Sequence, residues 1–358
     1  MTTSALLRHG VAHIGILLDG PSELLAARGI ESLDEIRGRM SQRRLKDCAA
    51  SERAHYVRIL QGYRGRCPHL KSAASKLALQ PSGRKFMSDP RSPSPAETYE
   101  RYLGPAIADP WTRVLLEYAV PRPGERVLDV ACGTGSVARQ IAPIVGVDGK
   151  VVALDVSLDM LRVARNIPVP AGAAIEWLEG NAMRLELPDD AFDLVVCQQG
   201  LQFFADRDAS VREMRRVLAD GGHVVISVWQ SLQHHPLYEA LFEATARHLN
   251  ASISALDLSF SLGDAEELRT LLSAAGFRQI EVISRSLTVR LPSPERFVEL
   301  TALGAATSIP AFAQLDTTSR RALVDAVSSE VQAGVQRFRD GDMLAFAMFT
   351  HIAVGYVQ

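Results

Sequence analysis

The 358-residue sequence lacks a hydrophobic run long enough to span a membrane. Its two prominent uncharged runs, 300–315 and 343–358, are 16 residues each, whereas a transmembrane helix needs roughly 20. The apolar stretch 10–18 ends at Asp19, and no small-residue cleavage site follows it, so the pattern does not favour an exported protein. We therefore expect a cytoplasmic protein that does not enter a membrane.

Cysteine is also scarce. The four cysteines, Cys48, Cys67, Cys132 and Cys197, show neither a CxxC pair nor a Cys/His ligand spacing. A disulfide framework or a structural zinc site would need such a pattern, so we expect neither and predict no metal. Hydrophobic residues (47%) and charged residues (22%) occur in ordinary proportions, which excludes wholesale disorder and permits a sizeable core.

The net charge is small, at −2, but it is unevenly distributed. Residues 1–88 carry 15 basic and 7 acidic side chains, a net of +8, and the remaining residues carry 24 and 34, a net of −10. Residues 81–95 hold four prolines and four serines, which is typical of a linker. We therefore predict a basic helical extension over 1–88 and a second domain over 89–358. Apolar residues at helical spacing predict three short helices in the extension, at 22–28, 32–40 and 49–61.

Downstream of the linker, short β-branched runs alternate with helical patterns. This alternation is typical of βαβ units, which build a parallel sheet with helices on both faces. The predicted strands are 126–130, 150–155, 174–178, 192–197, 223–229, 278–289 and 344–357. The predicted helices are 136–144, 158–165, 209–218, 237–249 and a capped helix within 260–277 that ends at Gly276.

A glycine-rich turn follows the first of these strands, in the sequence VLDVACGTG (127–135). Glycines let the backbone approach a ligand closely, and the N-terminus of the next helix presents free N–H groups. Gly133-x-Gly135-x-x-Ala138 also fits the dinucleotide fingerprint, which by itself is weak evidence. Asp129, four residues before Gly133, would repel a pyrophosphate and attract an ammonium group. The turn therefore favours a phosphate-free ligand with an amino-acid end.

Two further strand ends complete this pattern. Asp155 closes the second strand, 20 residues after Gly135, where a carboxylate can accept hydrogen bonds from both hydroxyls of a ribose. Asn181, after the third strand, offers a carbonyl oxygen to an exocyclic amine, and the Ala182 N–H can meet a ring nitrogen. An amino-acid end, a ribose and an adenine without phosphate together describe S-adenosylmethionine.

Residues 97–230 resemble the class I S-adenosylmethionine-dependent methyltransferases, in their UbiE-like, small-molecule branch. The resemblance implies an α/β fold with a Rossmann-like, doubly wound sheet of seven strands, mostly parallel with an antiparallel edge strand. It also implies a cofactor half at about 97–230 and a substrate cap with edge strands at about 231–358. The segments that carry it are VLDVACGTG (127–135), ALDVSLDML (153–161), GNAMRLELPDDAFDLVV (180–196) and REMRRVLADGGHVVIS (212–227).

The same resemblance implies S-adenosylmethionine as cofactor and gives roles to individual residues. Asp129 would face the methionyl amine, Asp155 the ribose, and Asn181 the adenine edge, where these enzymes frequently carry Asp instead. The implied cofactor-binding residues are Asp129, Ala131, Gly133, Thr134, Gly135, Asp155, Val156, Met160, Asn181, Ala182 and Gln198.

Methyl transfer is an in-line displacement that needs the nucleophile and the methyl group about 3 Å apart in a dry pocket. An oxygen or nitrogen nucleophile can also need a general base, for which His234, His235 and His351 are the candidates. The uncharged run 300–315 would supply an apolar roof or form a buried helix. Residues before the first strand and after the fourth are expected in the substrate pocket: Tyr99, Tyr102, Trp111, Gln202 and Phe203.

The N-terminal segment 4–62 resembles a different family, in the C-terminal tail of dihydroorotate dehydrogenase-like flavoproteins. The barrel strands, phosphate loop and catalytic base of that family would lie upstream of such a tail, so no dehydrogenase chemistry carries over. We interpret the segment as a fusion remnant or a misassigned start, with a docking or dimerisation arm as the alternative. The matching text is SALLRHG (4–10), HIGILLDG (13–20), GIESLDEIRGRMSQ (29–42) and ERAHYVRILQ (52–61).

We therefore expect an enzyme that transfers a methyl group from S-adenosylmethionine to a small, apolar or aromatic metabolite. A quinone-type C-methyltransferase of menaquinone or ubiquinone synthesis is an alternative within this class. An RNA-modifying or nucleic-acid-binding protein that uses the basic arm is a second alternative, disfavoured because the rest of the chain is acidic. A homodimer and a cofactor-binding regulatory protein without catalysis are left open. The sequence does not identify the acceptor or the methylated atom.

Overall fold

The computed structural model describes residues 94–305 and 315–358. The predicted basic extension over 1–88 and the segment 4–62 lie outside these residues. Of the predicted linker 81–95, the last two residues are described, and they begin helix α6 (Pro95–Thr98). The Ser94 hydroxyl accepts a hydrogen bond from the Glu97 N–H (3.2 Å), so this helix has a capped N-terminus.

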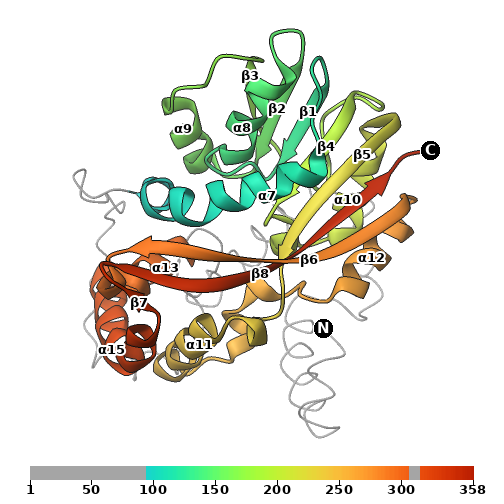
Figure 1. Cartoon of the computed structure of the whole chain (residues 1–358). Helices are drawn as coiled ribbons and strands as arrows, with labels where there is room; N and C mark the ends of the chain where they lie inside the picture. The colour runs from blue at the N-terminus through green and yellow to red at the C-terminus, as the bar shows by residue number, and fades with distance from the viewer. Residues whose placement is uncertain (1–93, 306–314) are drawn as a thin grey trace, which may run out of the picture. The chain divides into compact units, whose positions relative to one another are not determined.

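One mixed sheet forms the centre of the described chain (Figure 1). Its strands are β1 (Arg126–Val130), β2 (Lys150–Asp155), β3 (Ile175–Glu179), β4 (Phe192–Gln198), β5 (Leu218–Trp229), β6 (Arg278–Pro292), β7 (Arg339–Asp340) and β8 (Met343–Tyr356). Their order is β3-β2-β1-β4-β5-β8-β6, and the short β7 pairs with β8. β1 to β5 are parallel, and β8 runs antiparallel to β5 and β6. The order reverses between β1 and β4, which is where open α/β sheets bind ligands.

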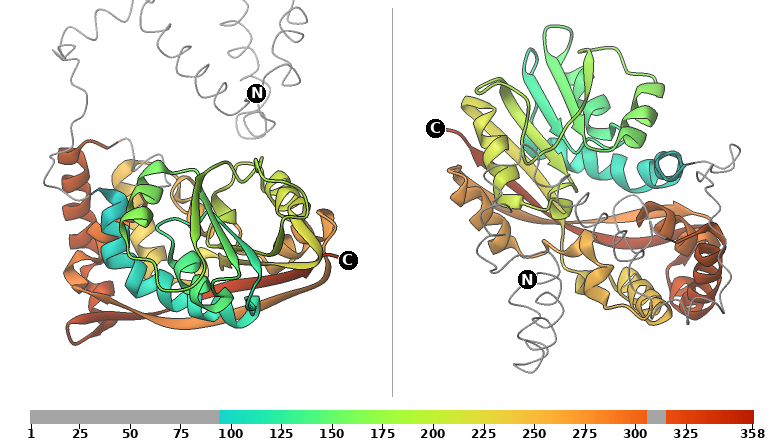
Figure 2. Two further views of the ribbon diagram at one scale, coloured as in Figure 1. Left: turned by 90° about the horizontal axis from the view of Figure 1, so that it is seen from above. Right: turned by 180° about the vertical axis from the view of Figure 1, so that it is seen from behind.

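Helices cover both faces of this sheet (Figures 1 and 2). Alternate side chains of each strand enter the two layers: Val127 and Val151 pack into the first, and Leu128 and Val152 into the second. Burial on both faces is what the near-continuous apolar strands predict. The first layer contains α7 (Asp109–Ala119), α8 (Ser136–Val145) and α9 (Leu158–Asn166), and the second contains α10 (Arg207–Arg216) and α12 (Ala265–Ala274).

A third group of helices packs around the part of β6 and β8 that runs on past the parallel strands (Figure 2). We call this group the cap; it consists of α11 (Pro236–Leu249), α13 (Phe297–Ala305) and α15 (Thr317–Arg337). Its core is rich in aromatic rings, including Tyr238, Phe260 and Phe346. No helix of the described residues is long and apolar enough to cross a membrane. Shorter helical turns are η3 (a π-helix, Tyr99–Ala108), η4 (Leu201–Phe203), η5 (Leu232–His234), η6 (Ile253–Ala255), η7 (Leu258–Phe260) and η8 (Pro294–Arg296).

The predicted fold class is confirmed, with the antiparallel pair β6–β8 at one edge of the sheet. The two largest differences from the predicted boundaries are at the start of β5 and the start of α12. β5 begins at Leu218, where a helix was expected to continue, because Leu218 pairs with Phe192 of β4. The predicted helix within 260–277 starts only after Asp264, whose carboxylate accepts the Glu266 N–H (2.8 Å) and caps α12. Of the run 300–315, the described part up to residue 305 is helical.

Candidate cofactor and acceptor site

A cavity of about 370 Å³ lies at the carboxyl ends of β1, β2 and β4. This volume is typical of a site for a small molecule. The strand ends form one part of its wall, where Ala131, Gly133 and Asp155 lie, and η3, α7 and α11 form another. Segments far apart in the sequence therefore meet around one space, at the position where the sheet topology predicts a ligand.

Asp129 lies in β1 beneath this strand edge and is 1% exposed. Its Oδ2 accepts a hydrogen bond from the Ala138 N–H of α8 (3.1 Å), whereas its Oδ1 has no partner among the described residues. Asp129 is not part of the cavity wall. Burial raises the pKa of its carboxyl to about 8. A carboxyl in this state needs a cationic donor before it ionises at neutral pH.

Gln198 ends β4, the strand next to β1, and lines the cavity. Its side-chain Nε2 donates to the Ala108 carbonyl (3.1 Å) and to Thr112 Oγ1 (3.0 Å). These two acceptors take both amide hydrogens and fix the orientation of the amide. The Gln198 Oε1 is enclosed and has no partner in the described chain. Two adjacent strand ends therefore each hold an unpaired acceptor oxygen.

Asp155 ends β2 and is 8% exposed. Its Oδ2 accepts the Gly133 N–H and its Oδ1 the Ser157 N–H, both at 2.8 Å. Burial raises the pKa of this carboxyl as well. Because each carboxylate oxygen can accept a second hydrogen bond, Asp155 can still receive two hydroxyl groups while it holds the turn.

The glycine-rich turn is built from left-handed backbone. Ala131 (φ 58°), Gly133 (φ 56°) and Gly135 (φ 88°) all have positive φ. A Cβ on Gly135 would lie 2.3 Å from the ring of Trp177, so any other residue there would force that ring to move. Gln199, at the end of β4, is also left-handed (φ 53°) and lines the same cavity. Such backbone strain clusters at functional sites.

Arg139 of α8 supports the turn from the other side. Its guanidinium donates to the Thr134 carbonyl and forms an ion pair with Glu100 of η3 (3.3 Å). Thr134 is buried and is not in the cavity wall. The ion pair links η3, which lines the cavity, to the glycine-rich turn.

The connection after β2, which holds the predicted cofactor-binding residues Val156 and Met160, forms another part of the cavity wall. Val156, Ser157 and Met160 line the cavity there. Asn181 and Ala182 do not line it. The Asn181 Oδ1 accepts the Met183 N–H (2.9 Å), and Ala182 is buried in the core of the α10–α12 layer.

Three of the five predicted substrate-pocket residues, Tyr99, Trp111 and Phe203, line the cavity. The other two do not. The Tyr102 ring lies beneath the guanidinium of Arg296 (4.8 Å), outside the cavity. Gln202 is buried and donates from Nε2 to the Gln199 Oε1 (3.3 Å).

The three predicted histidines all lie outside the cavity wall. His235 is buried; its Nε2 accepts the Phe349 N–H (3.0 Å), and burial lowers its pKa to about 4. His351 contacts the Ser284 hydroxyl and the Gly263 carbonyl, and burial lowers its pKa too. His234 is exposed. In the described ranges, no group of His, Cys, Asp and Glu side chains could hold a metal ion.

Aromatic rings make up much of the cavity wall. Trp111 and Trp229 meet edge to face with their centroids 5.6 Å apart, and Phe204, Phe242 and Phe260 add further rings. Within the described part of the chain, no Lys, Arg, His, Cys or Glu side chain lines the cavity. The aromatic part of the wall suits an apolar, ring-shaped molecule that carries no charge.

The sequence model of the ubiE/COQ5 methyltransferase family matches residues 102–289. The chain belongs to this family. It is an S-adenosylmethionine-dependent methyltransferase. The resemblance seen in the four sequence segments is confirmed.

Two relatives of this methyltransferase show how far the similarity extends. The ubiquinone/menaquinone biosynthesis C-methyltransferase UbiE of Hahella chejuensis is 36% identical over 165 residues, which are 45% of this chain and 64% of that protein. The protein of the same name from Shewanella frigidimarina is 31% identical over 185 residues, 48% of this chain and 73% of that protein. Among solved structures, YcgJ of Bacillus subtilis is similar with a TM-score of 0.45 and 18% identity, covering 69% of this chain and 97% of that chain.

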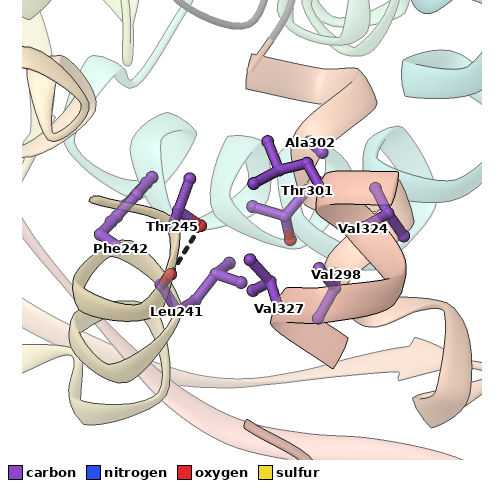
Figure 3. Close-up of a pocket in the computed structure, with 9 residues that line it drawn as sticks. Leu241, Phe242, Thr245, Val298, Thr301, Ala302, Val324 and Val327 are labelled. Carbon is purple, nitrogen blue, oxygen red and sulfur yellow. Dashed lines mark hydrogen bonds between the residues drawn. The ribbon is translucent and has the colours of Figure 1, made fainter. Parts of the chain in front are cut away.

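A second, much smaller cavity of about 10 Å³ lies in the cap of the methyltransferase (Figure 3). Leu241, Val298 and Val327 are among the aliphatic residues that line it, and the Thr245 hydroxyl there is held by the Leu241 carbonyl. Phe242 and Thr301 line both cavities. These two residues therefore form the partition between the large cavity and the interior of the cap.

Sequence reasoning missed several residues of this site. Arg139 stands four residues after Gly135, and that helical spacing could have suggested a contact with the turn. Trp229 and Tyr238 gave no local signal, because they reach the cavity only through the fold of β5 and α11 around it.

Proposed function

We propose that the strand edge of β1, β2 and β4 binds S-adenosylmethionine and that the adjoining aromatic cavity holds a small, apolar or aromatic methyl acceptor. One observation carries this proposal: the unpaired oxygens Asp129 Oδ1 and Gln198 Oε1 lie at neighbouring strand ends. A methionyl ammonium brings three donors and a positive charge, which fit both acceptors. A pyrophosphate would leave both unpaired.

The other residues of the wall support the same arrangement. We assign the ribose to Asp155, whose oxygens can accept two further hydrogen bonds, and the adenine to the neighbourhood of Val156 and Met160. The role of Asn181 and Ala182 at the adenine edge stays a prediction, since neither lines the cavity.

S-adenosylmethionine supplies a methyl group that is already activated on a sulfonium sulfur. The task of this chain is therefore to place the acceptor and exclude water. The titratable side chains in the wall are Asp155, Tyr99 and Tyr238. Asp155 holds the turn, and burial raises the pKa of both phenols, so neither tyrosine serves as a base near neutral pH. The site positions an acceptor that is nucleophilic on its own, such as an electron-rich ring.

A more specific acceptor follows from the relatives. Both are named as C-methyltransferases of ubiquinone and menaquinone biosynthesis, and an aromatic-rich cavity wall with Asp155 as its one carboxylate among the described residues suits a hydroquinone-like ring. The same wall, without basic side chains among the described residues, gives no support to a nucleic-acid substrate. We place the methyltransferase domain at 89–358; the role of residues 1–88, a homodimer and a cytoplasmic location stay predictions.

Calorimetric titration tests the cofactor part of this proposal. The full chain should bind S-adenosylhomocysteine and should not bind NADH. The variant Gln198→Leu should stay folded and bind S-adenosylhomocysteine more weakly. Binding of NADH alone would contradict the proposal. A metabolite screen with radiolabelled methyl donor then identifies the acceptor, and label found only in charged or polymeric products would contradict the acceptor class.

A further inference from the structure

Tyr238 is a buried tyrosine whose hydroxyl has no assigned role. It lies in the first turn of α11, is 8% exposed and lines the large cavity. Its ring is surrounded by apolar rings, with Phe260 and Phe297 at 5.6 Å and Phe346 at 5.8 Å between centroids. No described residue forms a hydrogen bond with its hydroxyl. A buried tyrosine hydroxyl ordinarily has such a partner, so the structure leaves this donor available.

The Tyr238 side chain lines the cavity, and the protein does not fully enclose its hydroxyl. The phenylalanine rings enclose the apolar part of the side chain. The oxygen itself is not among the unpaired polar atoms that the protein fully encloses, a group that does include Trp111 Nε1. The Tyr238 hydroxyl is therefore a polar group that α11 contributes to the aromatic wall of the large cavity.

A second phenol reaches the same cavity from η3. Tyr99 lines it, and its hydroxyl also has no hydrogen-bond partner in the described residues. Burial, and to a lesser extent Tyr99, raises the pKa of Tyr238. Burial raises the pKa of Tyr99 to about 12. Both hydroxyls therefore keep their protons and can act as hydrogen-bond donors in the cavity.

Other polar side chains of the cavity wall do not compete for that role. Gln199 donates to Thr350 Oγ1 (3.0 Å) and accepts from Gln202, so its amide is engaged. Ser259 and Thr301 line the cavity but are partly exposed, so water can satisfy their hydroxyls. Trp111 Nε1 is a further unpaired donor of this wall, but the protein fully encloses it. Among the hydroxyl-bearing side chains of the wall, Tyr238 is the one that is buried.

We infer that Tyr238, with Tyr99 on the wall of the same cavity, selects methyl acceptors whose aromatic ring carries a hydrogen-bond-accepting oxygen. This inference rests on the proposed function, because it places the acceptor in the aromatic cavity. The ring of the acceptor packs against Trp229 and Phe260, and its oxygen receives the Tyr238 hydroxyl. One fixed hydrogen bond on a ring held by apolar contacts decides which edge of the ring is presented to the methyl group. Tyr238 is thus a specificity and positioning residue.

A pair of isosteric probes tests the inference on the full chain saturated with S-adenosylhomocysteine. 2-Naphthol carries the ring oxygen, and 2-methylnaphthalene replaces it with a methyl group. Equilibrium dialysis gives the affinity of each probe for the unmodified chain, for Tyr238→Phe and for the control Tyr118→Phe. Tyr118 lies on α7 outside the cavity, with its ring beneath Arg285 (5.1 Å).

Tyr238→Phe should lower the affinity for 2-naphthol about five- to tenfold and leave the affinity for 2-methylnaphthalene unchanged, because the substitution removes one hydrogen bond and keeps the ring. Tyr118→Phe should change neither affinity. Equal effects on both probes, or no effect on 2-naphthol with S-adenosylhomocysteine bound normally, would overturn the inference alone. If the unmodified chain did not bind S-adenosylhomocysteine, the proposed function would fail, and the inference with it.

Discussion

The backbone N–H of Gly133 donates to the carboxylate of Asp155 at 2.8 Å. This contact joins the turn after β1 to the end of β2, so the two loops of the cofactor edge are held together by one side chain. The second oxygen of Asp155 binds the Ser157 N–H and so also fixes the start of α9. Asp155 therefore shapes the site as well as being available to a ribose.

Replacing Asp155 by Ala should weaken the binding of S-adenosylhomocysteine by roughly 1 to 3 kcal/mol, because hydroxyl groups and the Gly133 N–H lose their acceptor. Calorimetry measures this change. Asp159→Ala is the matched control, since that carboxylate is exposed on α9 and should alter the affinity by less than about 0.5 kcal/mol. Unaltered affinity in Asp155→Ala would remove this residue from the site.

The raised pKa of Asp129 predicts a pH-dependent cofactor affinity. Below about pH 8 the free carboxyl is protonated, and it must lose that proton to pair with an ammonium group. The affinity for S-adenosylhomocysteine should therefore rise from pH 6 to pH 8, by up to about tenfold per pH unit. Asp129→Asn should flatten this profile. A flat or falling profile in the unmodified chain would contradict the pairing.

The Asp129 carboxyl also makes the stability of the unliganded protein depend on pH. This stability should fall as the pH rises, whereas the cofactor affinity should increase. The pKa of this carboxyl in the folded state, about 8, lies above the unfolded value near 3.9, so the folded state binds one more proton between these values. This contribution to the free energy of unfolding is complete below the unfolded pKa and is lost as the pH rises through 8. Asp129→Asn should therefore reduce the fall in stability from pH 5 to pH 8, as measured by urea unfolding at each pH. An identical fall in both proteins would show that Asp129 is not the cause.

Gly135 lies in the glycine-rich turn, and Gly124 lies just before β1. Comparing alanine variants at these two positions separates steric effects from backbone effects. Both have positive φ, but a Cβ on Gly135 meets the Trp177 ring at 2.3 Å, whereas one on Gly124 meets nothing within 4 Å. Gly124→Ala should cost about 1 kcal/mol through strain alone. Gly135→Ala should lower the free energy of unfolding by roughly 1 to 3 kcal/mol more than Gly124→Ala, and it should also weaken cofactor binding. Urea unfolding compares the two, and equal losses would mean that Trp177 moves aside freely.

Phe242 offers a way to enlarge the acceptor cavity. Shortening it by Phe242→Leu should open the partition toward the small cavity in the cap. The chain should then bind an alkyl-substituted 2-naphthol more tightly relative to 2-naphthol itself. Phe192→Leu is the control, because Phe192 is buried in the sheet core and can lose stability without changing either cavity. The same relative affinity in both variants would show that Phe242 is not a partition.

Short sequence patterns predicted the parts of the site that are formed by residues close together in the sequence. The turn around Gly133 and the carboxylate of Asp155 follow directly from strand-end positions, and the structure places both in the cavity wall. His235 shows where such reasoning stops. Its sequence position beside the strand end suggested a base, but its ring nitrogens bind the backbone of β8 and the Ser231 carbonyl instead. Which face of a segment meets the cavity depends on contacts made more than 100 residues away, here with Phe349.

The edge-to-face pair Trp111–Trp229 has a practical consequence. The chain has three tryptophans; these two line the cavity, and the third, Trp177, lies against Gly135 of the glycine-rich turn. Every indole in the protein thus borders either the acceptor space or the cofactor turn. Intrinsic tryptophan fluorescence should therefore report the binding of the cofactor and of the methyl acceptor without an added label. Single Trp→Phe variants would distinguish the two binding events.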